Sequence, residues 1–162
     1  HLGGQPPRVD LEAEMALGRV LVALSEADGP DAPDGGRLVR AAHDCSAGGL
    51  IQTLVDAVLR HGVGASIDLT QLQGRDVVDD FTALFSESGA RAVVAVPEWA
   101  VAAVAAAAEA EDVPWARLGT TGGEMLVVSG GDVLADGGAG RPLVLDLAEL
   151  RERVEGVLPR LF

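Results

Sequence analysis

The stretch HDCSAGGLIQTLVDAVLRHG, residues 43–62, contributes most to the fold assignment of this chain. Its second half places apolar residues at helical spacing, in two adjacent stripes. Ser46 is a plausible N-cap for this helix. Arg60 and His61 suit the negative end of the helix dipole, and Gly62 suits the position after the last turn. The pattern therefore predicts a helix that ends at a well-marked C-terminus.

The turn before this helix combines residues that suit a phosphorylated ligand. A helix N-terminus offers unpaired N–H groups to phosphate, and glycine lets a ligand approach the backbone. An aspartate next to it supplies a hard oxygen for Mg²⁺. The alternative is a tightly packed turn without a ligand, and spacing alone leaves both open. Asp44 is thus the candidate metal ligand, and Ser46, Gly48 and Gly49 are the candidate cofactor-binding residues.

Working outward, helices and short apolar strands alternate along the chain. Asp10 is a predicted N-cap, and Asp146 with Glu149 resembles a capping box. The order of elements predicts an α+β fold, a mixed α/β sandwich with helices packed on a mixed sheet. The predicted helices cover about residues 11–27, 47–61, 77–85, 97–111 and 147–158, and the predicted strands about 65–69, 92–96, 115–118, 125–129 and 143–145.

Several further segments have a structural and a functional interpretation. LFSESGAR, residues 84–91, is either a polar cluster facing a cleft or partner, or a loop whose Glu87 is solvated or paired with Arg91. We expect GTTGGE, residues 119–124, to form a tight hairpin turn, because it lacks the lysine of a phosphate-binding loop. Asp79 and Asp80 are expected on a solvated helix face. No residue is singled out as catalytic.

Smaller features are expected to be structural. Cys45 is interpreted as a small buried side chain, and a nucleophilic role would need a lowered pKa. Trp99 and Trp115 are expected to anchor the core or an interface. DGGAG, residues 136–140, is expected to be a flexible turn.

Composition restricts the classes of partner. The chain has 162 residues and a formal net charge of −13, with 48 % hydrophobic residues. Such a surface repels phosphate backbones and anionic lipid, so we expect neither nucleic-acid nor membrane binding. A single cysteine and no visible signal peptide fit a cytoplasmic protein. The chain begins with His1, so we expect a piece of a longer polypeptide, with a lead-in segment and helix at 1–37 and the main domain at 38–162.

Taken together, these motifs resemble the C-terminal domain of the aminoimidazole ribonucleotide synthetase superfamily over about residues 38–162. HDCSAGGL matches its His-Asp-x-Ser-x-Gly-Gly-Leu signature, although Cys45 and Ala47 stand where the family often has an aliphatic residue and an acid. The missing acid argues against a second metal. GGQPPRVDLEAE at 3–14, LFSESGAR and ARLGTTGG at 116–123 resemble, within that superfamily, the last domain of the phosphoribosylformylglycinamidine synthase family.

The resemblance implies a purine-biosynthesis ligase that uses ATP and Mg²⁺. In that family ATP activates the amide of formylglycinamide ribonucleotide, a small-molecule substrate, and glutamine-derived ammonia displaces phosphate to give an amidine. Implied partners are the remaining synthetase domains, a glutaminase subunit and a small accessory subunit. Asp44 would lie near an auxiliary nucleotide–Mg²⁺ site or near the substrate cleft. Because the ATP-type domains are not visible here, we expect the 162-residue chain to be inactive alone.

Two other functions stay open. One is a non-catalytic binding or scaffolding domain of the same fold. The other is a domain of a different ATP-dependent member, such as aminoimidazole ribonucleotide synthetase, selenophosphate synthetase or thiamine-monophosphate kinase. If neighbouring domains normally cover this one, its surface should carry an exposed apolar patch.

Overall fold

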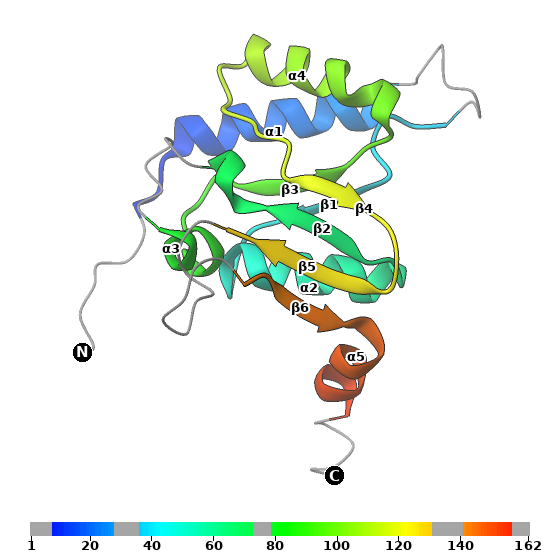
Figure 1. Ribbon diagram of the computed structural model, residues 1–162. Coiled ribbons are helices and arrows are strands. Elements are labelled where there is room, and N and C mark those ends of the chain that lie inside the picture. Colours follow the sequence, from blue (N-terminus) through cyan, green and yellow to red (C-terminus); the bar gives the residue numbers. More distant parts are fainter. Residues whose placement is uncertain (1–7, 28–35, 73–78, 131–140, 157–162) are drawn as a thin grey trace. The chain divides into compact units, whose positions relative to one another are not determined.

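The computed structural model describes residues 8–27, 36–72, 79–130 and 141–156 (Figure 1). The chain divides into two compact units, and both are discontinuous in sequence. The first unit is drawn from residues 1–48 and 87–115, and the second from 49–86 and 116–162. The backbone therefore passes from one unit to the other at residues 48–49, 86–87 and 115–116.

The first unit packs two helices with a two-stranded sheet. Helix α1 spans Leu11–Glu26, and α4 spans Val101–Ala110 after a short 3₁₀ turn, η2, at Glu98–Ala100. Strands β1, Ala41–Asp44, and β3, Ala92–Ala95, pair antiparallel. Its core cluster is built on three buried residues, with partly buried residues of the loops, β3 and α4 against them: Val20, Leu24 and Val104, then Val39, Val94, Val96, Ala107 and Val113.

The second unit contains a four-stranded mixed sheet in the order β4-β2-β5-β6. The strands are β2, Ala65–Asp68; β4, Gly119–Thr121; β5, Met125–Ser129; and β6, Leu143–Asp146. Strand β2 runs parallel to β5 and antiparallel to β4. The helical elements of this unit are α2, Gly49–His61; η1, Leu69–Leu72; α3, Asp80–Phe85; and α5, Leu147–Glu155.

Pairing register places the buried strand residues on one face of this sheet. Ala65 lies opposite Leu126, and Ile67 lies opposite Val128, and all four side chains are buried. Helix α2 buries a matching set of apolar side chains: Leu50, Leu54, Val55, Val58 and Leu59. The observed helices and mixed sheet confirm the predicted α+β class.

Local signals predicted the helix ends well. Asp10 accepts hydrogen bonds from the N–H groups of Glu12 and Ala13, as an N-cap does. Gly62 adopts a φ of 63°, and its N–H donates to the Val58 carbonyl, as expected after a helix C-terminus. Asp146 caps α5 through the N–H groups of Ala148 and Glu149. The side chain of Glu149 instead pairs with Arg153, so the capping box is only half formed.

The strand predictions needed correction around residues 115–124. The segment 115–118 has no regular structure, and the strand lies at Gly119–Thr121. The expected hairpin at 119–124 is wrong, because β4 and β5 do not pair with each other but flank β2 on its two sides. The connection passes over Gly64, whose N–H donates to Gly123 and whose carbonyl accepts from Gly122. A side chain at Gly64 would collide with the Met125 carbonyl, so glycine is required there.

The helix before the LFSESGAR segment also differs from its prediction. Helix α3 begins at Asp80, and the predicted residues Val77 and Val78 lie outside the described ranges. Asp79 is the N-cap and accepts from the N–H of Thr82. Asp80 is buried at 4 % exposure, so the expected solvated face is wrong at this residue. Leu84 is buried, whereas Phe81 and Phe85 are exposed and their rings lie against each other.

Three smaller expectations have mixed outcomes. Cys45 is buried, as predicted. Trp99 is more than a third exposed and Trp115 is half-buried, so neither is a core anchor. The strand predicted at 92–96 is β3, which pairs with β1 in a two-stranded sheet, and its four residues are half-buried. The turn at 136–140 lies outside the described residues, and the boundary at residue 37 stays a prediction.

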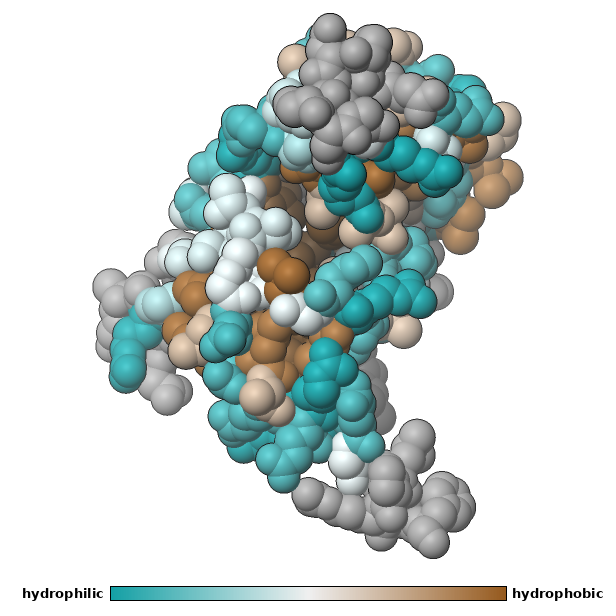
Figure 2. Space-filling view, turned by 90° about the vertical axis from the view of Figure 1, so that its right-hand side faces the viewer, coloured by the Kyte–Doolittle hydropathy of each residue, from teal (hydrophilic) through white to brown (hydrophobic). Residues whose placement is uncertain are grey.

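Apolar side chains remain on the surface. Figure 2 shows one face, on which hydrophobic residues are visible between hydrophilic ones. Large hydrophobic side chains exposed beyond half of their area include Leu11, Met15, Val22 and Phe81. None of the described helices is long and apolar enough to cross a membrane.

Candidate functional site

The candidate site begins where β1 ends. Asp44 closes the strand, and its side chain is 76 % exposed. The Nδ1 atom of His43 lies 2.7 Å from the Asp44 carbonyl oxygen and 3.5 Å from the Asp44 carboxylate. The N–H of Cys45 donates to the Arg91 carbonyl, which continues the β1–β3 pairing by one bond. Asp44 is therefore held at a strand end with its carboxylate facing solvent.

The turn that follows is tied to the second polar motif. The backbone N–H of Gly48 donates to the Oε1 atom of Glu87 at 2.8 Å. Gly48 has a φ of 80°, a left-handed conformation that favours glycine. For a loop, we expected Glu87 to be solvated or paired with Arg91. Glu87 instead has a backbone partner, Gly48, that neither expectation included. An anion that binds the Gly48 N–H would have to displace a carboxylate that already accepts from it.

The Glu87 loop is itself anchored by α1. The N–H of Ala90 donates to the Oε1 atom of Glu14 at 2.7 Å. Ala90 has a φ of 54°, which is uncommon for a residue with a side chain. A Cβ at Gly89 would lie 2.6 Å from the same Glu14 oxygen, so the loop needs glycine at this point. Two carboxylates, Glu14 and Glu87, therefore fix the backbone of the two motifs in the first unit.

The remaining candidates lie apart from this network. Helix α2 begins at Gly49, so Gly48 rather than Ser46 occupies the position before the helix. Gly49 belongs to the second unit and has a φ of 68°. A Cβ there would lie 2.6 Å from the Leu84 carbonyl and 2.8 Å from the Ser86 carbonyl. Close backbone packing therefore accounts for Gly49 without any ligand.

The sequence places Glu14 in the first turn of a helix but does not show its contact with Ala90, which lies 76 residues away. No local spacing marks such a residue. The DLEAE segment that contains it contributed to the family resemblance only as part of a longer motif.

A metal bound by protein groups alone does not fit the described residues. They contain no group of three or more His, Cys, Asp or Glu side chains that could hold an ion. Asp44 fits one role only, as a single carboxylate on a Mg²⁺ whose other ligands are phosphate oxygens and water, the usual coordination of nucleotide-bound magnesium. The exposed carboxylate of Asp44 is compatible with that role.

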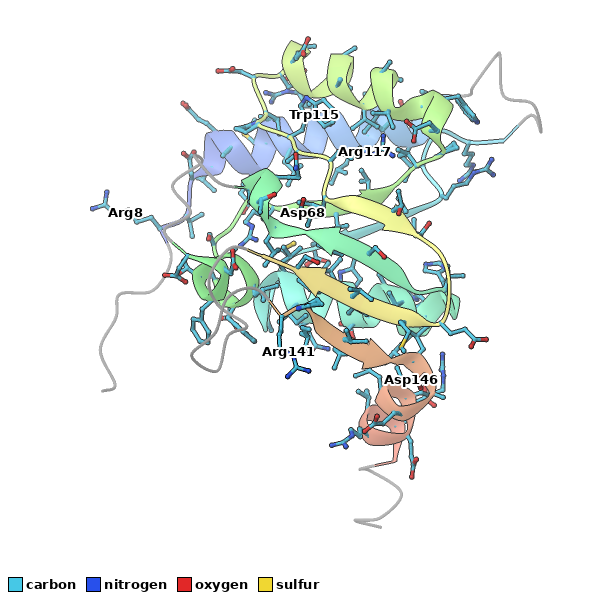
Figure 3. The ribbon with its side chains drawn as sticks, in the orientation of Figure 1. Arg8, Asp68, Trp115, Arg117, Arg141 and Asp146 are labelled. Atoms are coloured by element: carbon cyan, nitrogen blue, oxygen red, sulfur yellow. The ribbon has the colours of Figure 1, made fainter. Side chains whose placement is uncertain are left out.

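Asp68, in the second unit, has a shifted pKa. Hydrogen bonds from the Thr70 hydroxyl and then from the Thr70 N–H lower the pKa of the Asp68 carboxyl below the usual value for aspartate. Figure 3 shows Asp68 at the end of β2 and Asp146 at the opposite end of the sheet. The Asp68 carboxylate orders the turn into η1.

Comparison with known proteins assigns the family. Residues 1–145 match the model of the AIR synthase related protein, C-terminal domain. The chain belongs to this family. Among curated relatives, it is 46 % identical over 163 residues to the phosphoribosylformylglycinamidine synthase subunit PurL of Thermobifida fusca, and 42 % identical over 162 residues to that of Rhodococcus jostii. Both alignments cover the whole chain but only 18 % of the relative, so this family member spans about a fifth of the length of these PurL subunits.

Solved structures of the family share the fold. T. maritima PurL complexed with FGAR superposes with a TM-score of 0.65 at 20 % identity, over 88 % of this chain and 21 % of that one. The ATP complex of the same protein gives a TM-score of 0.63 at 20 % identity, over 88 % of this chain and 22 % of that one. The family-model match over residues 1–145 confirms the predicted membership of the aminoimidazole ribonucleotide synthetase superfamily.

Proposed function

We propose that this chain is the C-terminal part of a PurL-type phosphoribosylformylglycinamidine synthase, an ATP-dependent ligase of purine biosynthesis. The observation that carries the proposal is the alignment with Thermobifida fusca PurL, 46 % identical over the whole chain. The geometry supports it, because the Gly48–Glu87 hydrogen bond joins two of the motifs behind the resemblance, HDCSAGGL at 43–50 and LFSESGAR at 84–91.

The reaction proposed for the complete synthetase is an amide-to-amidine conversion. Phosphate transferred from ATP activates the amide oxygen of formylglycinamide ribonucleotide, and ammonia then displaces that phosphate. The ammonia would come from a glutaminase subunit, with a small accessory subunit in the same assembly. The proposed setting is the cytoplasm.

This chain would contribute positioning and one charged group. The Asp44 carboxylate is placed to ligate a nucleotide-bound Mg²⁺, either at an auxiliary nucleotide site or beside the substrate cleft. Ser46 and Gly48 would line the same phosphate region, and Gly49 would fix the start of α2. The chain alone would not turn over substrate, because it corresponds to only 18 % of the length of the PurL relatives.

A chimera tests the proposal. The residues of Thermobifida fusca PurL that align with this chain are replaced by it, and ATP- and ammonia-dependent amidine formation is measured. We expect turnover within about tenfold of the unmodified subunit, since a segment 46 % identical over its whole length should restore the residues of the site. The same subunit lacking the segment is the control and should be inactive. A folded chimera without turnover would contradict the proposal and favour a scaffolding domain.

A further inference from the structure

Helix α1 carries a second apolar face that nothing in the described chain covers. Leu11, Met15 and Val22 are exposed at 69 %, 64 % and 54 %. Together with Gly18 they follow the spacing i, i+4, i+7 and i+11, which keeps them within about 60° of one another around a helix. We call these four residues the outer stripe.

The opposite side of α1 is already used. Val20 and Leu24 are buried in the core cluster of the first unit, together with Val104 of α4. These residues lie roughly 180° from the outer stripe on the helix. A surface helix normally needs one apolar face, so a helix with two is typical of an element packed between two layers.

Gly18 points to close approach by a partner. A Cβ built at Gly18 meets no atom within 4 Å, so nothing in the described chain requires glycine there. Glycine inside a helix is less favourable than alanine because it loses more backbone freedom on folding. Between large exposed side chains at heptad-like spacing, a missing side chain leaves room for a facing helix.

We propose that the outer stripe is the docking surface for an apolar helical segment of the same polypeptide, outside the 162 residues of this chain. This inference rests on the proposed function, in which the chain is one part of a longer synthetase. The argument for that occupant is length: the matched region is 18 % of the PurL relatives, so more than four-fifths of such a polypeptide lies elsewhere. Three charged residues border one side of the stripe: Glu12, Arg19 and Glu26.

Methionine oxidation tests the proposal on the unmodified polypeptide. The chain has two methionines: Met15 in the stripe, and Met125 in β5, which is 43 % exposed. The complete synthetase carrying this chain is treated with peroxide, and each oxidation rate is divided by its rate in denaturant. If the stripe is covered, Met15 should be oxidised at least about fivefold more slowly than Met125 despite its greater exposure in this chain. Any smaller difference overturns the proposal.

A second measurement separates the two possible occupants. Light scattering gives the mass of the complete synthetase and of its Met15→Glu variant. Docking by the same polypeptide leaves the mass unchanged. Halving of the mass would show that a second copy covers the stripe, which overturns the proposal. If Met15→Glu does not fold, Met15→Gln takes its place, because a neutral side chain disturbs the packing of the helix less than a charged one.

Gly18→Ala adds a third test, in which the sign of the change in melting temperature shows whether the outer stripe is covered. In an uncovered helix alanine is favoured over glycine, so the melting temperature of the complete synthetase should rise or stay unchanged. Against a closely packed partner the added methyl group should lower it. A rise or no change therefore overturns the proposal. Amidine formation by the unmodified synthetase is measured in parallel. If no amidine forms, the proposed function has failed. If amidine forms but the outer stripe is uncovered, only the docking proposal has failed.

Discussion

Glu87 accepts a hydrogen bond from the backbone N–H of Gly48 at 2.8 Å, across 39 residues of sequence. Its loop is held in turn by Glu14, which accepts from the N–H of Ala90. The turn after β1 therefore depends on a loop that depends on α1. In both cases a side-chain carboxylate holds the backbone of a distant segment. Such side-chain to backbone hydrogen bonds more often act locally, as caps within one helix or turn.

Removing the Glu87 carboxylate should release the Gly48 amide. In Glu87→Ala, we expect hydrogen exchange at the Gly48 N–H to be about fivefold faster, corresponding to one exposed hydrogen bond. Glu87→Gln keeps a hydrogen-bond acceptor, so its Gly48 exchange rate should lie between those of Glu87→Ala and the parent chain. Glu109→Ala, an exposed glutamate on α4, is the matched control and should leave this amide unchanged. Equal exchange in Glu87→Ala and the parent would mean that the bond does not order the turn.

Asp44→Asn separates charge from shape. Because the Asp44 side chain is 76 % exposed, we expect the free energy of unfolding to change by less than about 0.5 kcal/mol. In the complete synthetase, turnover should fall by about tenfold or more at limiting Mg²⁺, since asparagine cannot replace a carboxylate ligand of that ion. Asp112→Asn, also exposed in the first unit, should change neither quantity. Normal turnover at every Mg²⁺ concentration would remove Asp44 from the candidate site.

Gly119→Ala should break the pairing of β4 with β2. A Cβ at this position would collide with the Ser66 carbonyl oxygen, which is backbone and cannot rotate away. We expect a loss of about 1–3 kcal/mol in the free energy of unfolding, the usual range for overpacking. Thr120→Ala on the same strand, where the side chain is exposed, should cost clearly less. Chemical denaturation of both variants makes the comparison.

The turn after β2 should show a defined pH dependence. Its carboxyl group, Asp68, has a lowered pKa in the fold, so its hydrogen bonds stabilise the turn above the pKa of the unfolded chain. That stabilisation is lost as the pH falls through the folded pKa. Thr70→Val removes the largest cause, the hydroxyl donor, and should raise the pKa of Asp68 toward the usual value for aspartate. Carboxyl NMR titration measures it, with Thr121→Val as the control that should not move it.

Elements with local signals could be predicted from the sequence. Asp10, Gly62 and Asp146 act on residues within a few positions, so their roles at helix ends are visible in the sequence. The turn at residues 43–50 was recognised in the same way. Its two glycines, Gly48 and Gly49, both adopt left-handed backbone conformations.

Features set by distant residues could not be predicted. The hairpin expected at 119–124 fails because β2, more than 50 residues earlier in the chain, lies between the two strands. Asp80 is buried because Gly130 leaves room for its carboxylate, a contact with no signature around residue 80. Glu14 and Glu87 act across 76 and 39 residues. In each case the partner, and not the local pattern, decides the environment.

The three passages of the backbone between units have a consequence for synthesis on the ribosome. Strand β1 cannot pair until β3 has been made, since Asp44 lies opposite Ala92. At about 5–20 residues per second, roughly 50 further residues take a few seconds to emerge. Strand β2 likewise waits for β4 and β5. During that interval both strands expose open edges, so premature chain termination in residues 69–90 should yield nascent fragments that need chaperones to stay unaggregated.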